Sequence, residues 1–265
     1  MSNAVDCYVE NAALLFKKGY MIVNFKDKKC IDLIQEQIEL VFAVDPTALH
    51  IHPLSDDERL KLIKQAKEKI LKKQLVKKLL LENLDTCEGL LGSDLDFSEG
   101  YLRVSRPNQE GDFIDWHRDT FVGNSRWECN FWFPIFPLGK GAGLMVVEGS
   151  HLIPSNNVRD VEEKNSFRKA VVKGSIANEL GYLYAPKCDD SIATMDFTRV
   201  RLISPEVGQA IFFFAHLIHR AQNFSNKTRV SIDVHLKHML APTNTKSGYY
   251  KPLTRSDFAH CIEKM

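Results

Sequence analysis

The chain has 265 residues, of which 44% are hydrophobic and 26% charged, so it can bury a sizeable core and is not a disordered polymer. Its 35 Lys and Arg against 34 Asp and Glu give a formal charge of +1, which provides no reason to expect a nucleic-acid partner. Apolar runs stay well short of the roughly 20 residues that cross a bilayer, and the first residues lack the pattern of a signal peptide. We therefore expect a cytoplasmic protein without a membrane span.

The six cysteines are widely separated, and none forms a Cys-x-x-Cys pair. Cysteines at such spacings in a chain of this length need not form disulfides. The pattern favours free thiols in a reducing compartment and argues against a zinc site built on cysteines.

The first part of the chain, residues 1–98, is expected to be mostly helical. A helix over residues 11–18 should end at Gly19, because glycine terminates helices readily. A short strand over 20–25 follows. Asp27 then predicts the cap of a second helix that runs to about residue 44, with isoleucines on one stripe.

A third helix is expected from Ser55, which forms a capping-box pattern with Glu58. Its apolar positions continue on one face as far as Leu79. Eight lysines lie between Lys61 and Lys78. A solvated helix face explains them best, and a dock for an anionic substrate or an acidic partner is the functional alternative.

From residue 99 onward, glycines and prolines separate short runs rich in β-forming residues. This spacing predicts an all-β sandwich or barrel. We expect one domain over 1–265, with its β core at 99–240 and a C-terminal tail at 241–265. The expected strands are Tyr101–Ser105, Cys129–Phe136, Leu144–Val147, Thr198–Ser204, Ala210–Phe214 and Arg229–Leu236.

The segment Trp116-His117-Arg118-Asp119 carries the first chemical signal. On an extended strand, residues two apart point to the same side, so His117 and Asp119 should face one spot. A second histidine from another strand would complete a two-histidine, one-carboxylate set, which holds ferrous iron and leaves positions open. His-x-Asp by itself is weak, so the remaining parts must come from elsewhere in the chain.

The segment 208–236 supplies those parts. His219 is the candidate third ligand, and Arg229 follows it by ten residues, after a turn expected at 223–227. A guanidinium binds a carboxylate in a bidentate manner and stays charged when partly buried. Ser231 lies on the same strand face and can donate a further hydrogen bond. A dicarboxylic co-substrate could thus be bound at both ends.

Other polar residues have two interpretations. His216 is a rival to His219, but spacing from Gly208 favours His219. His151 is expected to be a structural turn residue, with substrate contact as the alternative. The remaining candidates could contact co-substrate or substrate, or could belong to the core or an ordinary strand face: Asn130, Trp132, Asp233, His235, Arg103 and Ser105. The run Phe212–Phe214 is expected to be core.

With these residues in place, the sequence resembles the phytanoyl-CoA dioxygenase-like family of iron(II)/2-oxoglutarate oxygenases. Trp116–Asp119 resembles the family's Trp-His-x-Asp, and Gly143–His151 resembles its Gly-x-Leu…Pro-Gly-Ser-His. Gly19–Phe25 resembles its entry motif. Gly208, His219, Asn223 and Arg229 resemble its distal-histidine strand pair. Glu148 and Gln209 depart from the family pattern, which has Pro and Asp there, but both lie outside the expected ligand set.

The resemblance implies a mainly β protein with a double-stranded β-helix (jelly-roll, cupin-like) core and an N-terminal helical buttress. It also implies Fe(II) held by His117, Asp119 and His219, with 2-oxoglutarate and O2 as co-substrates. Arg229 and Ser231, and as a weaker candidate Asn130, would bind 2-oxoglutarate. Related halogenases have Gly or Ala at the carboxylate position, so Asp119 favours hydroxylation, or another oxidative outcome, over halogenation.

The substrate is expected to be a small molecule, with a polar or carbohydrate-linked metabolite favoured. A non-catalytic metal- or sugar-binding jelly-roll protein is the alternative, and a zinc hydrolase using the same three side chains is a further rival. The sequence gives no oligomeric state.

Overall fold

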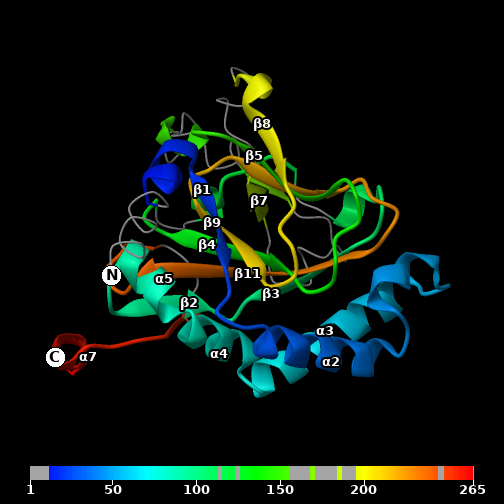
Figure 1. The fold of residues 1–265 in the computed structure, drawn as a ribbon, viewed down its shortest axis with the longest axis horizontal. Helices are drawn as coiled ribbons and strands as arrows, with labels where there is room; N and C mark the ends of the chain where they lie inside the picture. The colour runs from blue at the N-terminus through cyan, green and yellow to red at the C-terminus, as the bar shows by residue number, and fades with distance from the viewer. Residues whose placement is uncertain are drawn as a thin grey trace.

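The computed structural model describes residues 12–112, 115–122, 126–154, 168–170, 184–186, 195–243 and 248–264. The fold consists of antiparallel sheets with a layer of helices on one side (Figure 1). Within this part of the chain, no helix is long and apolar enough to cross a membrane.

The larger sheet is built around β11 (Arg229–His238), which pairs with three other strands. Among the described residues it has seven strands in the order β1-β9-β4-β11-β2-β12, with β3 also on β11. The other strands are β1 (Tyr20–Asn24), β2 (Leu95–Ser98), β3 (Tyr101–Ser105), β4 (Cys129–Pro134), β9 (Gln209–Phe214) and β12 (Tyr250–Pro252).

The second sheet contains β10 (His219–Asn223), β5 (Ala142–Val147) and β8 (Val200–Ile203), in that order. An isolated bridge between His117 and His219 extends it at the β10 edge. A separate pair joins β6 (Arg168–Ala170) to β7 (Tyr184–Pro186). The two main antiparallel sheets form the jelly-roll, cupin-like core that the resemblance implied.

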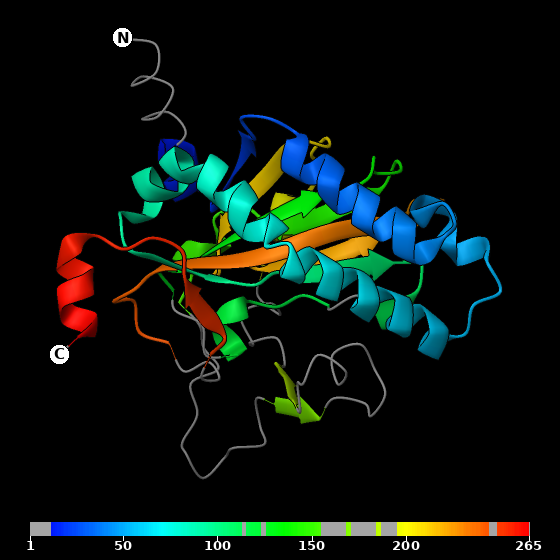
Figure 2. The same cartoon turned by 90° about the horizontal axis from the view of Figure 1, so that it is seen from below.

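Helices cover the outer face of the larger sheet (Figure 2). Residues 12–18 are also helical. The named helices are α2 (Lys29–Phe42), α3 (Asp56–Lys72), α4 (Leu75–Glu82), α5 (Leu84–Leu91) and α7 (Asp257–Glu263). Short 3-10 turns are η1 (Pro46–Ile51), η2 (Glu110–Asp112), η3 (Asp119–Val122), η4 (Ser150–Leu152) and η7 (Phe197–Arg199).

The alternation of β11 explains how this sheet separates a core from a site. Val230, Ile232, Val234 and Leu236 are buried in the same apolar cluster as residues of α2 and α4. Because successive side chains of a strand point to opposite faces, the intervening residues of β11 face the interior of the jelly roll. These are Arg229, Ser231, Asp233 and His235.

The longest helix expected in the N-terminal part is broken in the structure. The capping box at Ser55 and Glu58 is present, but the helix it opens does not continue to Leu79. It ends at Lys72, and Gln74 adopts a left-handed conformation with φ 54° before α4 begins. This break turns Leu75, Val76, Leu79 and Leu80 of α4 into the core. An apolar stripe that continues along the sequence therefore predicts a longer helix than the structure contains.

The expected cap of the second helix is off by one residue. Lys28 is the N-cap of α2 and makes no side-chain capping bond, while the Asp27 carboxylate accepts from the backbone of Lys29 at 2.9 Å. The helix before Gly19 does end there, and Gly19 has φ +89°. A Cβ at Gly19 would lie 2.5 Å from both His151 and Leu217, so this turn requires glycine.

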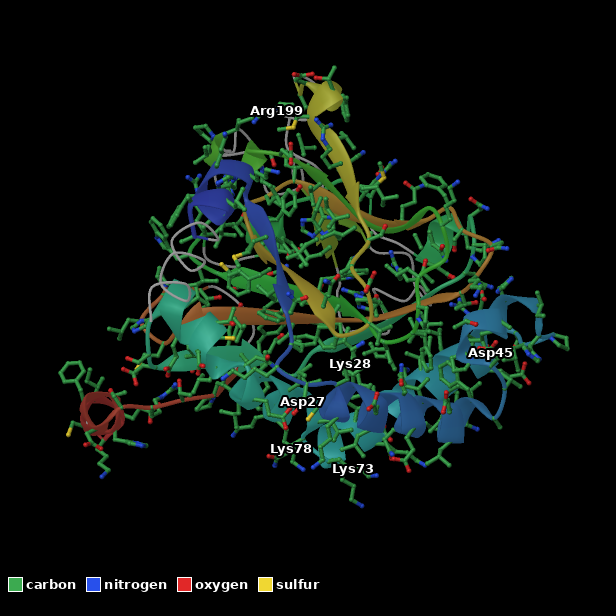
Figure 3. The ribbon with its side chains drawn as sticks, viewed as in Figure 1. Asp27, Lys28, Asp45, Lys73, Lys78 and Arg199 are labelled. Carbon is green, nitrogen blue, oxygen red and sulfur yellow. The ribbon has the colours of Figure 1, made fainter. Side chains whose placement is uncertain are left out.

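The lysine-rich segment lies mainly on the solvent side of the helical layer. Of its eight lysines, all but Lys67 and Lys77 are exposed. Lys73 and Lys78 project from the outer side of the helices, away from the sheets (Figure 3). For these residues a solvated helix face is the fitting interpretation.

Two short strands of the larger sheet, β2 and β12, were absent from the sequence prediction, as were β6 and β7. β2 lies in the segment expected to be helical, and β12 lies in the segment expected to be a tail. Each has four residues or fewer, too few to show a period-two pattern. Both are formed by pairing at the edge of the larger sheet, through β11 and β2 respectively.

A buried ion-pair group fixes the start of α3 to the chain that leads into His117. Asp112 is bonded by Arg59 at 3.1 Å and by Arg106 at 2.9 Å, and Asp56 bonds both arginines as well. The side chains of Arg59 and Asp112 are 4% and 1% exposed, so their charges compensate each other away from water. The helical layer is thereby connected to the segment that carries the candidate ligands.

Candidate functional site

His117, Asp119 and His219 lie together between the two sheets, all buried. Backbone bonds in both directions between His117 and His219, each 3.0 Å, bring the first histidine to the start of β10. Asp119 is the first residue of η3 rather than part of a strand, and its backbone N–H donates to Ala215 at 2.9 Å. The 3-10 turn, not strand alternation alone, aims the carboxylate at the histidines.

Both imidazoles point their Nε2 atoms at the carboxylate of Asp119. Nε2 of His117 lies 3.3 Å from Oδ1, and Nε2 of His219 lies 3.8 Å from Oδ2. The Nδ1 atom of His117 bonds the carbonyl of Asp115 at 2.6 Å, and that of His219 bonds the carbonyl of Leu217 at 3.0 Å. Because Nδ1 carries the proton toward a carbonyl, Nε2 keeps its lone pair for another partner.

The electrostatics favour a neutral imidazole at His219. Burial, followed by the neighbouring His117, lowers the pKa of His219 to about 4. Phe213 packs edge-on against its ring at 4.8 Å. A neutral, buried histidine with a free lone pair is the form that ligates a metal ion.

The donor atoms fit a divalent metal such as iron. The three candidate donors all lie within 4.8 Å of one another, and ligands about 2.1 Å from one metal sit about 3 Å apart at adjacent positions. Two imidazoles and one carboxylate on one side of a metal ion leave its other coordination positions open, as in non-heme Fe(II) sites.

Asn130 lies beside the carboxylate rather than at the far end of the site. Its amide nitrogen donates to Oδ2 of Asp119, the same oxygen that faces His219. Such a bond fixes the orientation of a ligating carboxylate. Its own Oδ1 atom is buried and has no partner among the described residues. The amide nitrogen of Asn130 is thus used by Asp119 in this structure, and its contact with 2-oxoglutarate stays a prediction.

Arg229 and Ser231 line the inner face of β11, as expected. The Arg229 guanidinium donates to the carbonyls of Gly143 at 3.1 Å and Gln222 at 3.3 Å, both on the opposite sheet. It lies over the ring of Trp132 at 5.7 Å. Burial, and then the charge of Arg103, lower the pKa of Arg229 to about 10, so it remains a cation at neutral pH.

Buried polar atoms around Arg229 have no partners among the described residues. They are Arg229 Nε, Ser231 Oγ, Trp132 Nε1 and Ser105 Oγ. Buried groups of this kind are nearly always hydrogen-bonded. The two nitrogen atoms can only donate, and the two serine hydroxyls can donate as well. Their chemistry fits an anionic group with several acceptor oxygens, such as a carboxylate.

A second buried network lies on the same face and was missed by the sequence analysis. Nδ1 of His235 lies 2.6 Å from Oε1 of Glu128, and the Tyr250 hydroxyl donates to the other oxygen of Glu128. Asp233 is 3.9 Å from Nε2 of His235. His235 and Asp233 were expected as a core pair, but the closer partner of His235 is Glu128, which is 107 residues away in sequence.

The remaining histidines lie outside the triad. His216 has its Nδ1 atom 2.9 Å from the Thr120 hydroxyl and its Nε2 atom 3.2 Å from the carbonyl of Ile153. His151 lies in η4 and bonds the carbonyl of Phe16 at 2.9 Å. Both positions agree with structural roles, and the structure brings His219, not His216, to the other two candidates.

The architecture and the site together define a class: a jelly-roll protein with a buried two-histidine, one-carboxylate cluster. A scan against protein-family models found no match to this chain, and a search of curated protein sequences found none either. Solved structures, by contrast, match over nearly the whole chain.

Three of these solved structures define the similarity. A protein described as a non-heme monooxygenase, ThoJ, has a TM-score of 0.58 at 15% identity, covering 93% of this chain and 84% of its own. The epimerase SnoN, in complex with Fe3+, alpha ketoglutarate and nogalamycin RO, has a TM-score of 0.55 at 13% identity, covering 94% and 99%. EctD from S. alaskensis, with 2-oxoglutarate and 5-hydroxyectoine, has a TM-score of 0.57 at 13% identity, covering 93% and 83%. These likenesses establish the fold.

Proposed function

We propose that this protein is an iron(II)/2-oxoglutarate-dependent dioxygenase, similar to the phytanoyl-CoA dioxygenase-like family. The observation that carries the proposal is the convergence of three buried donors, His117, Asp119 and His219, with both Nε2 atoms free to ligate. The buried donors around Arg229, which have no partners among the described residues, support a co-substrate site for an anion in the same interior.

Each residue has a role that follows from its contacts. His117, Asp119 and His219 would hold Fe(II), and Asn130 would keep the Asp119 carboxylate in place through its amide. Arg229 and Ser231 would bind the distal carboxylate of 2-oxoglutarate. With these ligands bound, iron, 2-oxoglutarate and O2 supply the oxidation of a C–H bond, with release of succinate and CO2. The protein orients the co-substrate and keeps water from the buried donors.

The solved relatives support the choice of cofactor. SnoN is described with Fe3+ and alpha ketoglutarate, and EctD with 2-oxoglutarate. Their folds match that of this chain, and the donor set here is the one that non-heme Fe(II) oxygenases use. We therefore assign Fe(II), 2-oxoglutarate and O2 to this site.

The proposed reaction is hydroxylation of a small polar or carbohydrate-linked metabolite in the cytoplasm. Asp119 supplies the carboxylate ligand, so the position that a halide would take is filled. SnoN, with the same fold, is described as an epimerase, so the fate of the oxidised carbon needs its own measurement. Incorporation of label from 18O2 into product supports hydroxylation, whereas an unlabelled, isomerised product contradicts it.

The decisive experiment is turnover of 2-oxoglutarate by the full chain with Fe(II), measured as succinate formed and O2 consumed. Slow uncoupled turnover is expected even without prime substrate, and it should disappear under nitrogen. A non-catalytic jelly-roll protein would bind metal but give no succinate. A zinc hydrolase would act equally well without O2. Either result would exclude the proposed function.

A further inference from the structure

Arg103 occupies the inner face of the edge strand β3, opposite Ser231 of β11. Its guanidinium lies 4.9 Å from the centre of the Tyr101 ring. The side chain is half-buried. Within the described residues it makes neither a hydrogen bond nor an ion pair, although Asp233 lies opposite Tyr101, two positions away on the neighbouring strand. The charges of Arg103 and Asp233 interact, since Arg103 favours the ionised form of Asp233, but the two side chains form no direct ion pair among the described residues. An anion that contacts the half-buried guanidinium directly would therefore stabilise it.

A second cation approaches the same aromatic ring. The ammonium group of Lys67, from α3, lies 5.2 Å from the centre of the Tyr101 ring. Burial lowers the pKa of Lys67, and Arg103 adds to this, while the charge of Glu99 opposes it. Glu99 is already bonded by Lys251. Two cations on one ring repel each other, so both would be stabilised by an anion bound between or beside them.

This pair is separate from the expected co-substrate site. Arg229 lies opposite Ser105, and its head group bonds carbonyls of the second sheet. Arg103 leans the other way along β3, toward Tyr101. The charge of Arg103 is the second cause, after burial, of the lowered pKa of Arg229. The two guanidinium groups are thus close enough to repel each other, but they point in different directions and would contact different ligands.

The Arg103 and Lys67 pair also lies close to the candidate metal ligands. The Tyr101 ring is 6.0 Å from the ring of His235. His235 pairs across the sheet with Asn130, and Asn130 donates to Asp119. An anion held at Tyr101 would therefore place the rest of its molecule near the triad.

We propose that Arg103 and Lys67, gathered over the Tyr101 ring, bind an anionic group, a carboxylate or a phosphate, of the prime substrate. This inference rests on the proposed function and names its substrate class: a small molecule with one anionic group remote from the oxidised carbon. Arg103 binds the group through its planar fork, and Lys67 adds a point charge. Tyr101 keeps the two cations in place through cation–π contact.

The test uses the full chain with zinc(II) in place of iron and with saturating 2-oxoglutarate, so that the Arg229 site is filled and no turnover occurs. Inorganic phosphate and, separately, acetate are titrated at constant ionic strength. The arginine Nε–H and the backbone amide signals are followed by 1H–15N NMR, so that binding can also be measured in a variant without Arg103. We expect at least one of the anions to shift an arginine signal that is missing in Arg103→Met.

The variants give graded effects. Arg103→Met should weaken binding of that anion about tenfold or more, because a charge-assisted hydrogen bond is lost. Arg103→Lys should recover part of the affinity, and Lys67→Met should lose several-fold. Lys61→Met is the matched control, because Lys61 is an exposed lysine of the same helix. It should change nothing, and thermal melts confirm that each variant folds.

Three results would overturn the inference: neither anion binds to the unaltered chain, Lys61→Met weakens binding as much as Lys67→Met, or Arg103→Met weakens 2-oxoglutarate binding as much as Arg229→Met. The last result would make Arg103 part of the co-substrate site. The proposed function fails separately, through absence of oxygen-dependent succinate formation, whatever the anion titration shows.

Discussion

The two faces of β11 differ in what satisfies their side chains. On the outer face, Val230, Ile232 and Val234 are at most 2% exposed and pack into the apolar cluster shared with the helices. On the inner face, Arg229 and Ser231 are equally buried, yet they keep polar atoms without partners among the described residues. The outer-face side chains are satisfied by apolar packing within the protein, whereas these polar atoms of the inner face would gain hydrogen-bond partners when ligands bind.

Neighbouring residues of this one strand should therefore affect different quantities, either the stability of the fold or the affinity for ligands. Outer-face changes should lower the free energy of unfolding and leave ligand affinity nearly unchanged. Changes at Arg229 and Ser231 on the inner face should do the reverse. The predictions below either break this separation or make it sharper.

The largest effect is expected for Asp119→Ala, which removes the carboxylate between the two histidines. Fe(II) affinity, measured by anaerobic titration, should collapse, and succinate formation should stop. Asp115→Ala is the matched control, because the Asp115 side chain is 76% exposed and outside the cluster. Full-strength iron binding in Asp119→Ala would remove Asp119 from the ligand set.

Phe131→Ala tests the outer face beside the site. Phe131 is fully buried, packs edge-on against Phe212 at 5.2 Å, and directly follows Asn130 in β4. Truncating a buried phenylalanine costs about 3–5 kcal/mol, which chemical denaturation would measure. The fraction that stays folded should bind Fe(II) and 2-oxoglutarate with unchanged affinity. A large loss of affinity would show that the two faces are coupled.

Arg229→Ala tests the inner face. Loss of a buried partner for a carboxylate costs about 2–5 kcal/mol, or roughly 30- to 5000-fold in affinity for 2-oxoglutarate. Arg229→Lys should recover part of this, and Fe(II) binding should hardly change. A 2-oxo acid with a single carboxylate should be much less affected. The apparent affinity for 2-oxoglutarate at saturating iron decides the matter, and an unchanged value would refute the assignment.

The pH dependence of stability tests the buried network behind Asn130. Burial alone would lower the pKa of His235, but the hydrogen bond and charge of Glu128, with Asp233 and Asp119, raise it to about 9. A raised pKa stabilises the fold fully below about pH 6.5, and this contribution disappears as pH rises through 9. The metal-free chain should lose about 3 kcal/mol over that window.

Glu128→Gln should flatten this pH profile, because the raised pKa depends mainly on that carboxylate. The Tyr250 hydroxyl, which also bonds Glu128, keeps a hydrogen-bond acceptor in the variant. Equilibrium unfolding at several pH values measures both curves. A profile that keeps its slope in Glu128→Gln would show that another group titrates.

The smallest effect is expected for Ser231→Ala. We compare it with Ile232→Ala, because the two residues are neighbours in β11 whose side chains lie on opposite faces of the sheet. Ser231 should lose one hydrogen bond to the co-substrate, about 0.5–1.5 kcal/mol, or roughly two- to tenfold in 2-oxoglutarate affinity. Its stability should be unchanged, because its buried hydroxyl has no partner among the described residues to lose. Ile232→Ala should show the opposite pattern.

Sequence reasoning predicted those parts of the site that depend on local spacing. His117 and Asp119 are two residues apart, so local spacing predicts that they face the same spot. His219 lies about a hundred residues further along the chain, and its spacing from Gly208 and Arg229, together with the resemblance to the family motif, connected it to them. Glu128 meets His235 only through pairing across the sheet, 107 residues away in sequence, and Tyr250 joins the network by bonding Glu128. No pattern within the sequence could connect them.

The fold shows the same limit. The jelly-roll class followed from the resemblance, and most strands of the core followed from their β-rich runs. The left-handed break at Gln74 did not, because an apolar stripe continues across it. Tertiary packing of α4 on the sheet, rather than local propensity, decides where α3 ends.

The position of β11 near the end of the chain has a consequence for how this protein folds. Three strands that it joins, β2, β3 and β4, are synthesised about a hundred residues earlier. Until residues 229–238 arrive, these strands have exposed backbone edges and apolar faces, which are sites of misassociation. Pairing across such distances in sequence is slow. The nascent chain can therefore complete the larger sheet only after residues 229–238 are synthesised. A chaperone that shields β4 until then should raise the yield of folded protein.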